Sequence, residues 1–208
     1  MKIINSLFLL IASIIISSCI VVKNTDVYEE SNEKQVITLS PKPTIAMSDE
    51  IVRSVDGDMI AFLPQDWFFV NILNETSADV IAVAVNKDYT LSAVFTKLLP
   101  NDNSVNIVRR EGVIGLARIF YEKKLNKSAG SIKKVGNTTK VALGPLEFGQ
   151  YMYIAPNSTE NCRSAVFVSN SGTYYEFSLI PMTFRAKQLP TEEEIDNIFK
   201  SIISTIQY

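Results

Sequence analysis

The residues with the most specific chemistry stand near the start of the chain, at a cysteine. Ile16-Ser17-Ser18-Cys19 follows an apolar run of ten residues, Leu7 to Ile16, and Lys2 places a positive charge before that run. The run is too short for a membrane-spanning helix, which needs about 20 residues. Its length, the preceding charge and the small residues Ser17 and Ser18 are typical of a signal peptide with a small-residue cleavage site. An ordinary secretory signal with an incidental cysteine and an uncleaved anchor are the alternatives.

This stretch resembles the lipobox of bacterial lipoproteins, although Ile16 stands where that family more often has leucine. The resemblance implies a signal peptide over residues 1–18 and a mature chain that begins with a lipidated Cys19. Each buried methylene of an acyl chain contributes about 0.8 kcal/mol, so two or three chains would hold the protein stably at a membrane. Ile20 follows the cysteine, where lipoproteins of the inner membrane usually have aspartate. The resemblance therefore implies the bacterial cell envelope, with the periplasmic face of the outer membrane favoured over the inner membrane and the cell surface.

The rest of the chain lacks the residues that most catalytic and metal sites use. It has no histidine, which removes the commonest general base and metal ligand, and Cys162 is its only cysteine besides Cys19. Without a histidine to activate it, Cys162 is interpreted as a buried or incidental thiol; a disulfide to another chain and a nucleophile are the alternatives. Phosphate-binding loops, dinucleotide fingerprints and nucleophile elbows are also missing from the sequence. We therefore expect a non-enzymatic protein without a cofactor or a metal.

Charge marks one candidate binding surface. The formal net charge of the whole chain is −2, so its composition predicts no nucleic-acid partner. Residues 118–134, however, contain six basic residues against Glu122 as the one acidic residue. Such a patch could bind anionic headgroups, a glycan or an acidic protein, and a solvated helix end is the alternative interpretation. The six basic residues are Arg118, Lys123, Lys124, Lys127, Lys133 and Lys134. The aromatic residues near Trp67 and at Tyr151 and Tyr153 form a second candidate ligand surface.

Composition divides the mature chain into a tether and one domain. Residues 20–48 are polar and lack a sustained hydrophobic period, and they contain Pro41 and Pro43. We therefore expect residues 19–48 to form the lipidated cysteine and a flexible tether, with a short strand at Val36 to Leu39 as an alternative. Residues 49–208 are long enough for a single globular domain with its own core.

Within this domain, turn signals and apolar runs predict an antiparallel sheet. Ile51 to Val55 and Met59 to Leu63 flank the tight turn Asp56-Gly57. Trp67 is expected to anchor one end of the core because large aromatic side chains dominate core energetics. The continuous apolar run at residues 79–86 predicts a central strand that forms a hairpin with residues 89–98. Further strands are expected at residues 132–135, 139–142, 146–154, 164–169 and 173–180.

Two helices are expected to cover the sheet. Apolar residues recur at close to helical spacing from Val105 to Leu125, and Gly112 and Gly115 inside this segment are expected to mark close packing against the sheet. Thr191, with Glu194 three residues later, forms a capping box ahead of an apolar stripe from residue 195 to residue 206. Strands, a middle helix and an amphipathic C-terminal helix predict an α+β sandwich.

Leu63-Pro64-Gln65-Asp66-Trp67, followed by a hairpin and a closing helix, resembles the Mog1/PsbP-like superfamily over about residues 50–208. The resemblance implies that fold. Members serve as assembly factors, extrinsic photosystem subunits and periplasmic lipoproteins, and most are not enzymes, but the resemblance transfers no functional residue. The expected function is a non-catalytic, membrane-anchored envelope lipoprotein that acts as an accessory or protein-binding module. A ligand- or glycan-binding module, a hydrolase that uses carboxylates and an immunity-type inhibitor of a secreted toxin are the alternatives.

Overall fold

The computed structural model describes residues 36–40, 42–71, 78–156, 158–182 and 188–208. The lipobox-like stretch, its cleavage site and Cys19 therefore lie outside the described residues. Among the residues that are described, no helix combines the length and the apolar character needed to span a membrane.

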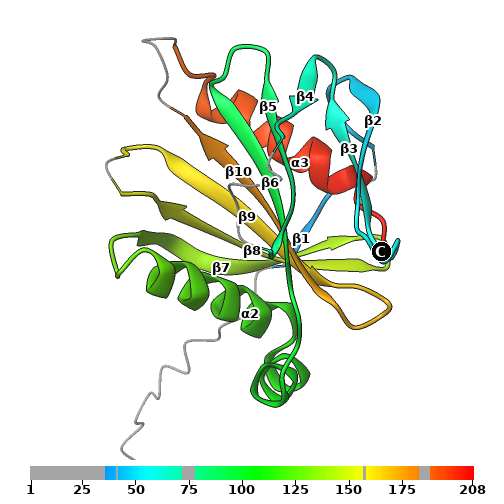
Figure 1. Cartoon of the computed structure of the whole chain (residues 1–208), viewed down its shortest axis with the longest axis vertical. Coiled ribbons are helices and arrows are strands. Elements are labelled where there is room, and N and C mark those ends of the chain that lie inside the picture. Colours follow the sequence, from blue (N-terminus) through cyan, green and yellow to red (C-terminus); the bar gives the residue numbers. More distant parts are fainter. Residues whose placement is uncertain (1–35, 41, 72–77, 157, 183–187) are drawn as a thin grey trace, which may run out of the picture. The chain divides into compact units, whose positions relative to one another are not determined.

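An eight-stranded sheet forms the centre of the domain (Figure 1). All neighbouring strands pair antiparallel except the first two, which are parallel. A separate two-stranded sheet consists of β2 (Met47–Arg53) and β3 (Ile60–Pro64), which confirms the hairpin expected around Asp56-Gly57. The strands of the large sheet, in spatial order, are β1 (Val36–Thr38), β7 (Lys133–Leu143), β8 (Leu146–Ile154), β9 (Asn161–Val168), β10 (Tyr174–Pro181), β6 (Leu91–Leu98), β5 (Val80–Asn86) and β4 (Trp67–Phe69).

The folded domain begins before residue 49, where the composition placed its start. Strand β1 pairs with β7, and the Leu39 amide donates to the Ala142 carbonyl at 3.0 Å. Further along, the Thr44 amide donates to the Ser201 hydroxyl oxygen at 3.0 Å. Part of the segment assigned to the tether is thus packed on the domain. The short strand at Val36 to Leu39, the alternative to a continuous tether, is therefore present as β1. Its pairing partner lies about a hundred residues away along the chain, so no local pattern indicates where it pairs.

Two strand predictions were wrong. Strand β5, expected to be central, lies second from the edge, and most of its residues are only partly buried. The strands expected at 132–135 and 139–142 are one continuous strand, β7, with a register shift between Val135 and Thr139. Gly136 was expected to lie in a turn between two strands; in the structure it has a φ of 63° within the irregular part of β7. A bulge of this kind keeps the strand paired while one segment leaves the regular register.

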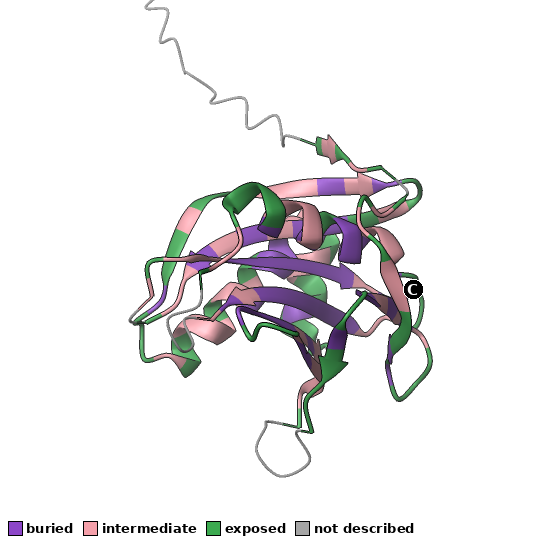
Figure 2. Ribbon diagram, turned by 90° about the horizontal axis from the view of Figure 1, so that it is seen from above, coloured by how far each residue is buried: buried purple, intermediate pink, exposed green. Residues whose placement is uncertain are grey.

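The two expected helices lie on opposite faces of the sheet (Figure 1). Helix α2 (Asp102–Lys127) packs against β7, β8 and β9, and helix α3 (Glu192–Thr205) packs beside β3. Capping boxes start both helices, at Asn101 and at the predicted Thr191. The strands between them are buried at their centres, and the solvent-facing helix surfaces are exposed (Figure 2).

The glycines of α2 do not contact the sheet as expected. Gly112 has a φ of 62° and separates two helical segments, while a Cβ on Gly115 would collide with Ile107 and Glu111 of the preceding turns. The closest approach to the sheet is instead at Gly149 of β8, where a Cβ would overlap the backbone carbonyl of Val113. Gly149 is therefore the residue that lets α2 lie directly on the sheet.

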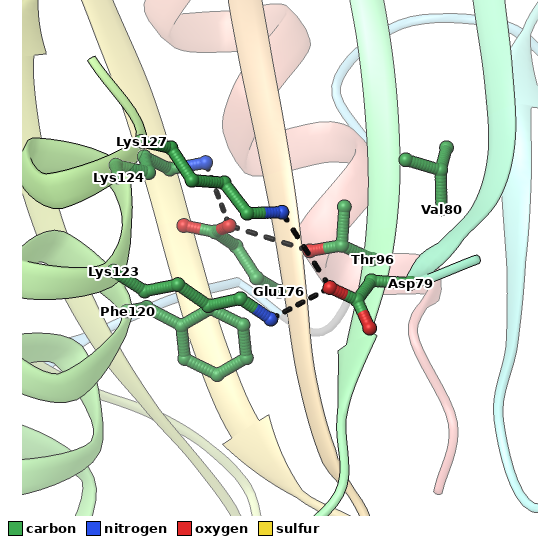
Figure 3. Close-up of a pocket in the computed structure, with 8 residues that line it drawn as sticks. All are labelled: Asp79, Val80, Thr96, Phe120, Lys123, Lys124, Lys127 and Glu176. Carbon is green, nitrogen blue, oxygen red and sulfur yellow. Dashed lines mark hydrogen bonds and ion pairs between the residues drawn. The ribbon is translucent and has the colours of Figure 1, made fainter. Parts of the chain in front are cut away.

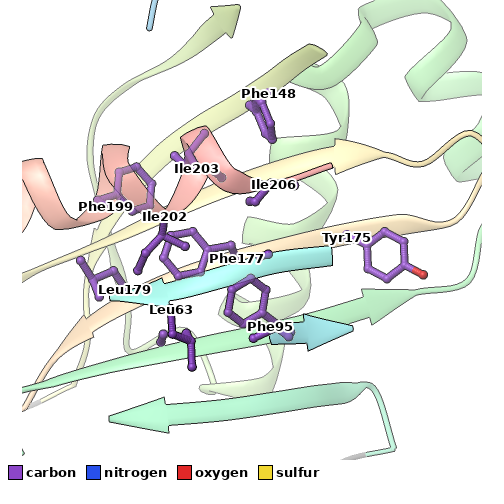
Figure 4. Close-up of a cluster of buried hydrophobic side chains, with 14 of the residues drawn as sticks. Leu63, Phe95, Phe148, Tyr175, Phe177, Leu179, Phe199, Ile202, Ile203 and Ile206 are labelled. Carbon is purple, nitrogen blue, oxygen red and sulfur yellow. The ribbon is translucent and has the colours of Figure 1, made fainter. Parts of the chain in front are cut away.

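Each helix covers its own hydrophobic core. Phe120 and Leu116 of α2 pack with Tyr151, Tyr153 and other residues on one face. The larger core lies on the opposite face under α3 and the β2–β3 hairpin (Figure 4). There Phe177 stacks between Phe95 and Phe199, at centroid distances of 5.0 and 5.4 Å. Trp67 is 8% exposed within this core, which confirms its predicted role as an anchor.

Two polar contacts attach the outer elements to the large sheet. Asp58, in the β2–β3 turn, accepts hydrogen bonds from Ser54, Ser169, Ser171 and Tyr175, the last three from β10 and the turn before it. At the other end, the buried Arg163 of β9 bonds Glu192 and lies 3.9 Å from Asp196, both on α3. These charges are used to position the hairpin and the helix.

Candidate functional site

A small pocket lies between α2 and the strands β10, β6 and β5 (Figure 3). Its volume is about 80 Å³, and it combines acidic and basic side chains with an apolar wall. We call it the ionic pocket, and its lining residues are Asp79, Val80, Thr96, Phe120, Lys123, Lys124, Lys127 and Glu176.

The inner layer of the ionic pocket is a buried ion pair. Glu176 is 2% exposed, and its Oε2 accepts from Lys124 Nζ at 2.8 Å and from the Thr96 hydroxyl at 3.4 Å. The other oxygen, Oε1, accepts a short hydrogen bond from the Tyr151 hydroxyl. Burial, and then the neighbouring charge of Glu176, raises the pKa of Tyr151 well above its usual value. Tyr151 therefore remains a neutral donor, and the Glu176 carboxylate is neutralised inside the protein.

The outer layer of the ionic pocket is more exposed. Asp79 Oδ2 lies 2.7 Å from Lys123 Nζ and 3.5 Å from Lys127 Nζ. The hydrogen bond from Lys123 is the main cause that lowers the pKa of Asp79. The Lys127 side chain is 58% exposed, against 29% for that of Lys123. Two ammonium groups thus face a single carboxylate, which leaves this layer with an excess of one positive charge.

Cys162 lies behind the inner layer, within the α2 core. It is 1% exposed, and burial raises the pKa of its thiol. Burial likewise raises the pKa of the adjacent Tyr153, whose ring lies 5.6 Å from Lys124 Nζ. A thiol in this environment stays protonated at neutral pH, which agrees with the interpretation of Cys162 as a buried thiol.

The six basic residues singled out in the sequence are divided by the structure. Lys123, Lys124 and Lys127 line the ionic pocket and pair with its acids. Arg118 lies apart from them and bonds Glu111 at 2.5 Å and Glu122 at 3.7 Å. On β7, Lys133 is exposed and Lys134 Nζ lies 6.0 Å from the centroid of the Tyr121 ring. The stretch therefore does not present six uncompensated charges, and the acids that pair with its lysines come mostly from other elements.

Sequence reasoning missed the two acids of the pocket. Asp79 is separated from Lys123 by 44 positions, so no local spacing connects them. Glu176 carried one available signal, because it is the single charged residue within the apolar strand Tyr174–Pro181. A lone charge in a buried strand needs a partner, and this reasoning would have predicted a cation facing it.

The alternative function as a hydrolase requires two carboxylates that face each other in a cleft, one of them with a raised pKa. Asp79 and Glu176 both line the ionic pocket, but each bonds a lysine, and the pKa of Asp79 is lowered. Asp79 is therefore not the protonated acid that such chemistry uses at neutral pH. Among the described residues, no group of three or more acidic or cysteine side chains could hold a metal ion.

Exposed aromatic residues gather at the edge strand β4. Phe68, Phe69 and Val70 are 39%, 40% and 39% exposed, and Tyr89, at the β5–β6 turn, is 45% exposed. The rings of Phe68 and Tyr89 meet edge to face with centroids 5.4 Å apart. We call these three aromatic residues, together with the aliphatic Val70, the aromatic edge.

The aromatic surface expected from the sequence is exposed only in part. Tyr151 and Tyr153 are buried, at 2% and 5% exposure, so the prediction was wrong for these two residues. Near Trp67, which is itself buried as the core anchor, Phe68 and Phe69 are exposed as expected. Strand alternation turns Phe68 away from the core that Trp67 enters.

Comparison with known proteins identifies the fold. No family model matches the chain, and no curated protein matches it. Among solved structures, the PsbP protein (CyanoP) of the cyanobacterium Synechocystis sp. PCC 6803 is 13% identical with a TM-score of 0.57, over 76% of this chain and 92% of that one. The Ran-binding protein Mog1p of Saccharomyces cerevisiae is 17% identical with a TM-score of 0.47, over 78% and 96%. The mixed α+β architecture and its likeness to PsbP confirm the predicted fold class, and at these identities the likeness concerns the fold alone.

Proposed function

We propose that this chain is a lipid-anchored accessory protein of the bacterial cell envelope whose PsbP-like domain binds a protein partner and catalyses no reaction. The observation that carries this proposal is the aromatic edge of Phe68, Phe69, Val70 and Tyr89. Aromatic residues are enriched at protein interfaces, and an edge strand offers backbone groups to which an extended segment can add. The favoured partner is therefore a protein that places an extended, apolar segment along β4.

The use of charge in the domain supports a binding role over a catalytic one. Asp58, Arg163 and Glu176 each join two separate elements through hydrogen bonds or ion pairs. These charges serve to position elements of the fold, which supports a binding role over a catalytic one.

The position of the aromatic edge supports a protein partner. Strand β1, the first described element after the lipobox-like stretch, and β4 are the two outer strands of the sheet. Seven strand spacings of about 4.8 Å separate them, or roughly 34 Å. The aromatic residues thus lie at the edge of the sheet opposite β1, and β4 is left as an outer strand to which a segment of a partner protein can add.

The anchor is tested by Cys19→Ser. We expect the wild-type protein to incorporate a palmitate analogue and to sediment with membranes, and the variant to lose both properties because the thiol is the attachment point in this motif. Metabolic labelling and membrane fractionation measure these outcomes, and Cys162→Ser is the matched control because its thiol is buried. Continued labelling of the Cys19→Ser variant would show that the anchor assignment is wrong.

The partner is tested by photo-crosslinking in intact cells. Benzoylphenylalanine in place of Phe69 should crosslink to a protein other than this chain, whereas the same group in place of Val55, which is 90% exposed on the β2–β3 turn, should not. Phe68→Ser combined with Phe69→Ser should lower recovery of that protein about tenfold or more, as for central interface residues. Leu99→Ser, an exposed apolar residue away from the edge, is the control.

Three crosslinking results would contradict the proposal. They are crosslinks only to lipid, crosslinks only to a second copy of this chain, and equal recovery of the partner by the double variant and the control. Circular dichroism of each variant establishes that it is folded before recovery is compared.

A further inference from the structure

We propose that the ionic pocket receives the carboxylate of an aspartate or glutamate side chain from the protein partner. This inference rests on the proposed function, because it concerns the partner that the domain binds. It adds a site that the aromatic edge does not contain and gives that site a defined chemistry.

The first argument is charge. In the inner layer, Lys124 and Glu176 neutralise each other, and the remaining oxygen of Glu176 is occupied by Tyr151. In the outer layer, Lys123 and Lys127 share Asp79. The lining residues therefore carry one more positive charge than negative, and a single negative charge would balance them. A carboxylate that bridges the two outer ammonium groups would make charge-assisted hydrogen bonds with both.

The second argument is size and polarity. A pocket of about 80 Å³ has room for a group of a few heavy atoms. Phe120 lies beside Lys123 and provides an apolar wall next to the ammonium groups, and Val80 lines the pocket on the side of Asp79 (Figure 3). An acidic side chain matches both features, since its methylene groups can contact the wall while its carboxylate reaches the lysines.

The third argument is accessibility. Lys127, in the last turn of α2, is the most exposed of the three lysines, and its 3.5 Å contact with Asp79 is the longest of the three lysine contacts. An exposed pair of this kind contributes little to stability, about 0.2–1 kcal/mol. Lys127 can therefore move toward an entering carboxylate at small cost, while the buried Lys124–Glu176 pair stays in place.

Phe68, one residue of the aromatic edge, lies on the same face of the sheet as the pocket. Trp67 enters the core under α3, so strand alternation directs Phe68 toward the face that carries α2 and the pocket, and Phe69 toward the other face. Phe68 pairs with Val85, five residues along β5 from the pocket residue Val80. Five residues of a strand span about 17 Å, so one extended partner segment can contact both sites.

The charge balance favours a carboxylate over a phosphate group. A phosphate monoester carries about −1.5 to −2 charges at pH 7, more than the excess of one positive charge in the pocket. It would also place additional negative charge close to Asp79 and Glu176. A lipid headgroup or free phosphate is therefore the competing outcome in the experiment below.

The test uses the full-length protein in neutral maltoside micelles and two short peptides. One is acetyl-Gly-Gly-Glu-Gly-Gly-amide, and the other has glutamine in place of glutamate, so the two differ only in charge at one side chain. Amide chemical shifts are followed by nuclear magnetic resonance. We expect the glutamate peptide to shift Val80, Thr96 and Phe120 in a saturable manner and the glutamine peptide to leave them unchanged. Lys127→Ala should weaken this binding about fivefold, as expected for one exposed ion pair, and Lys133→Ala should not.

Several outcomes would overturn the inference. These are equal shifts with both peptides, no saturable shift up to the solubility limit of the glutamate peptide, tighter binding of inorganic phosphate than of that peptide, and unchanged binding by Lys127→Ala. The cellular crosslink at Phe69 separates the two proposals. If the partner is still captured at wild-type level by the Lys127→Ala variant, the pocket inference fails and the proposed function stands. If no partner is captured but the glutamate peptide binds, the proposed function fails on its own.

Discussion

Replacing Lys124 with methionine should lower the free energy of unfolding by about 3–4 kcal/mol, the typical cost of leaving a buried charge without its partner. Glu176 is 2% exposed, and among the residues that the structure describes its charged partner is Lys124. Methionine keeps most of the volume of the lysine stem and removes the ammonium group. The remaining donors, Tyr151 and Thr96, are neutral and cannot replace that charge.

Chemical denaturation of three variants measures this effect. Lys127→Met, which removes a lysine from the exposed outer layer, should cost less than about 1 kcal/mol. Adding Glu176→Gln to Lys124→Met should recover at least half of the loss, since the buried negative charge is then gone while Tyr151 keeps an acceptor. A double variant that is no more stable than Lys124→Met would show that the cost comes from packing and not from the unpaired carboxylate.

Asp58→Asn should lower the free energy of unfolding by about 2 kcal/mol at neutral pH, because hydrogen bonds to a carboxylate are stronger than those to an amide. Asp58 accepts from four hydroxyl groups, including Tyr175 at 2.6 Å, and an asparagine nitrogen in its place could only donate. The loss should loosen the β2–β3 hairpin, which the carboxylate joins to the β9–β10 turn. Tyr175→Phe removes one of the four bonds and should cost about 1 kcal/mol.

The effect of Asp58→Asn should depend on pH in a defined direction. Partial burial alone would raise the pKa of Asp58, but the hydrogen bonds from Ser171, Tyr175, Ser169 and Ser54 outweigh it and hold the pKa well below its usual range. A lowered folded-state pKa stabilises the protein above the unfolded value of about 3.9 and loses that contribution as the pH falls further. Denaturation curves of wild type and variant should therefore differ constantly above about pH 5 and converge below about pH 4. A difference that grows in acid would contradict this account.

The pKa of Tyr175, one of the hydrogen-bond donors to Asp58, is also shifted. Burial, together with the hydrogen bond to Asp58, raises the pKa of Tyr175 to about 12. Tyr175 therefore stays protonated and donates throughout the pH range in which Asp58 is ionised. Of the two groups in the Asp58–Tyr175 hydrogen bond, only Asp58 titrates below about pH 10.

Local sequence signals were enough to predict the elements that depend on near neighbours. The capping box at Thr191 and the apolar stripe after it predict α3, because both act within one or two turns of helix. The turn at Asp56-Gly57 predicts the β2–β3 hairpin for the same reason, and Trp67 predicts a core anchor by its size alone. The lipobox-like stretch at Cys19 is likewise a local pattern, and the anchor that it implies remains a prediction.

Only the tertiary structure decided the sheet order and the composition of the ionic pocket. The apolar sequence of β5 predicts a central strand, but β5 lies beside the edge strand β4. The segment that contains β1 was assigned to the tether, but β1 pairs with β7. The sequence places Lys123 and Lys124 in a basic patch, and only the folded structure brings Asp79 and Glu176 beside them as ion-pair partners. The physical reason is the range of the interactions. Caps and periodicity act between residues a few positions apart, whereas strand pairing and charge neutralisation join residues whose separation along the chain carries no information about their distance in space.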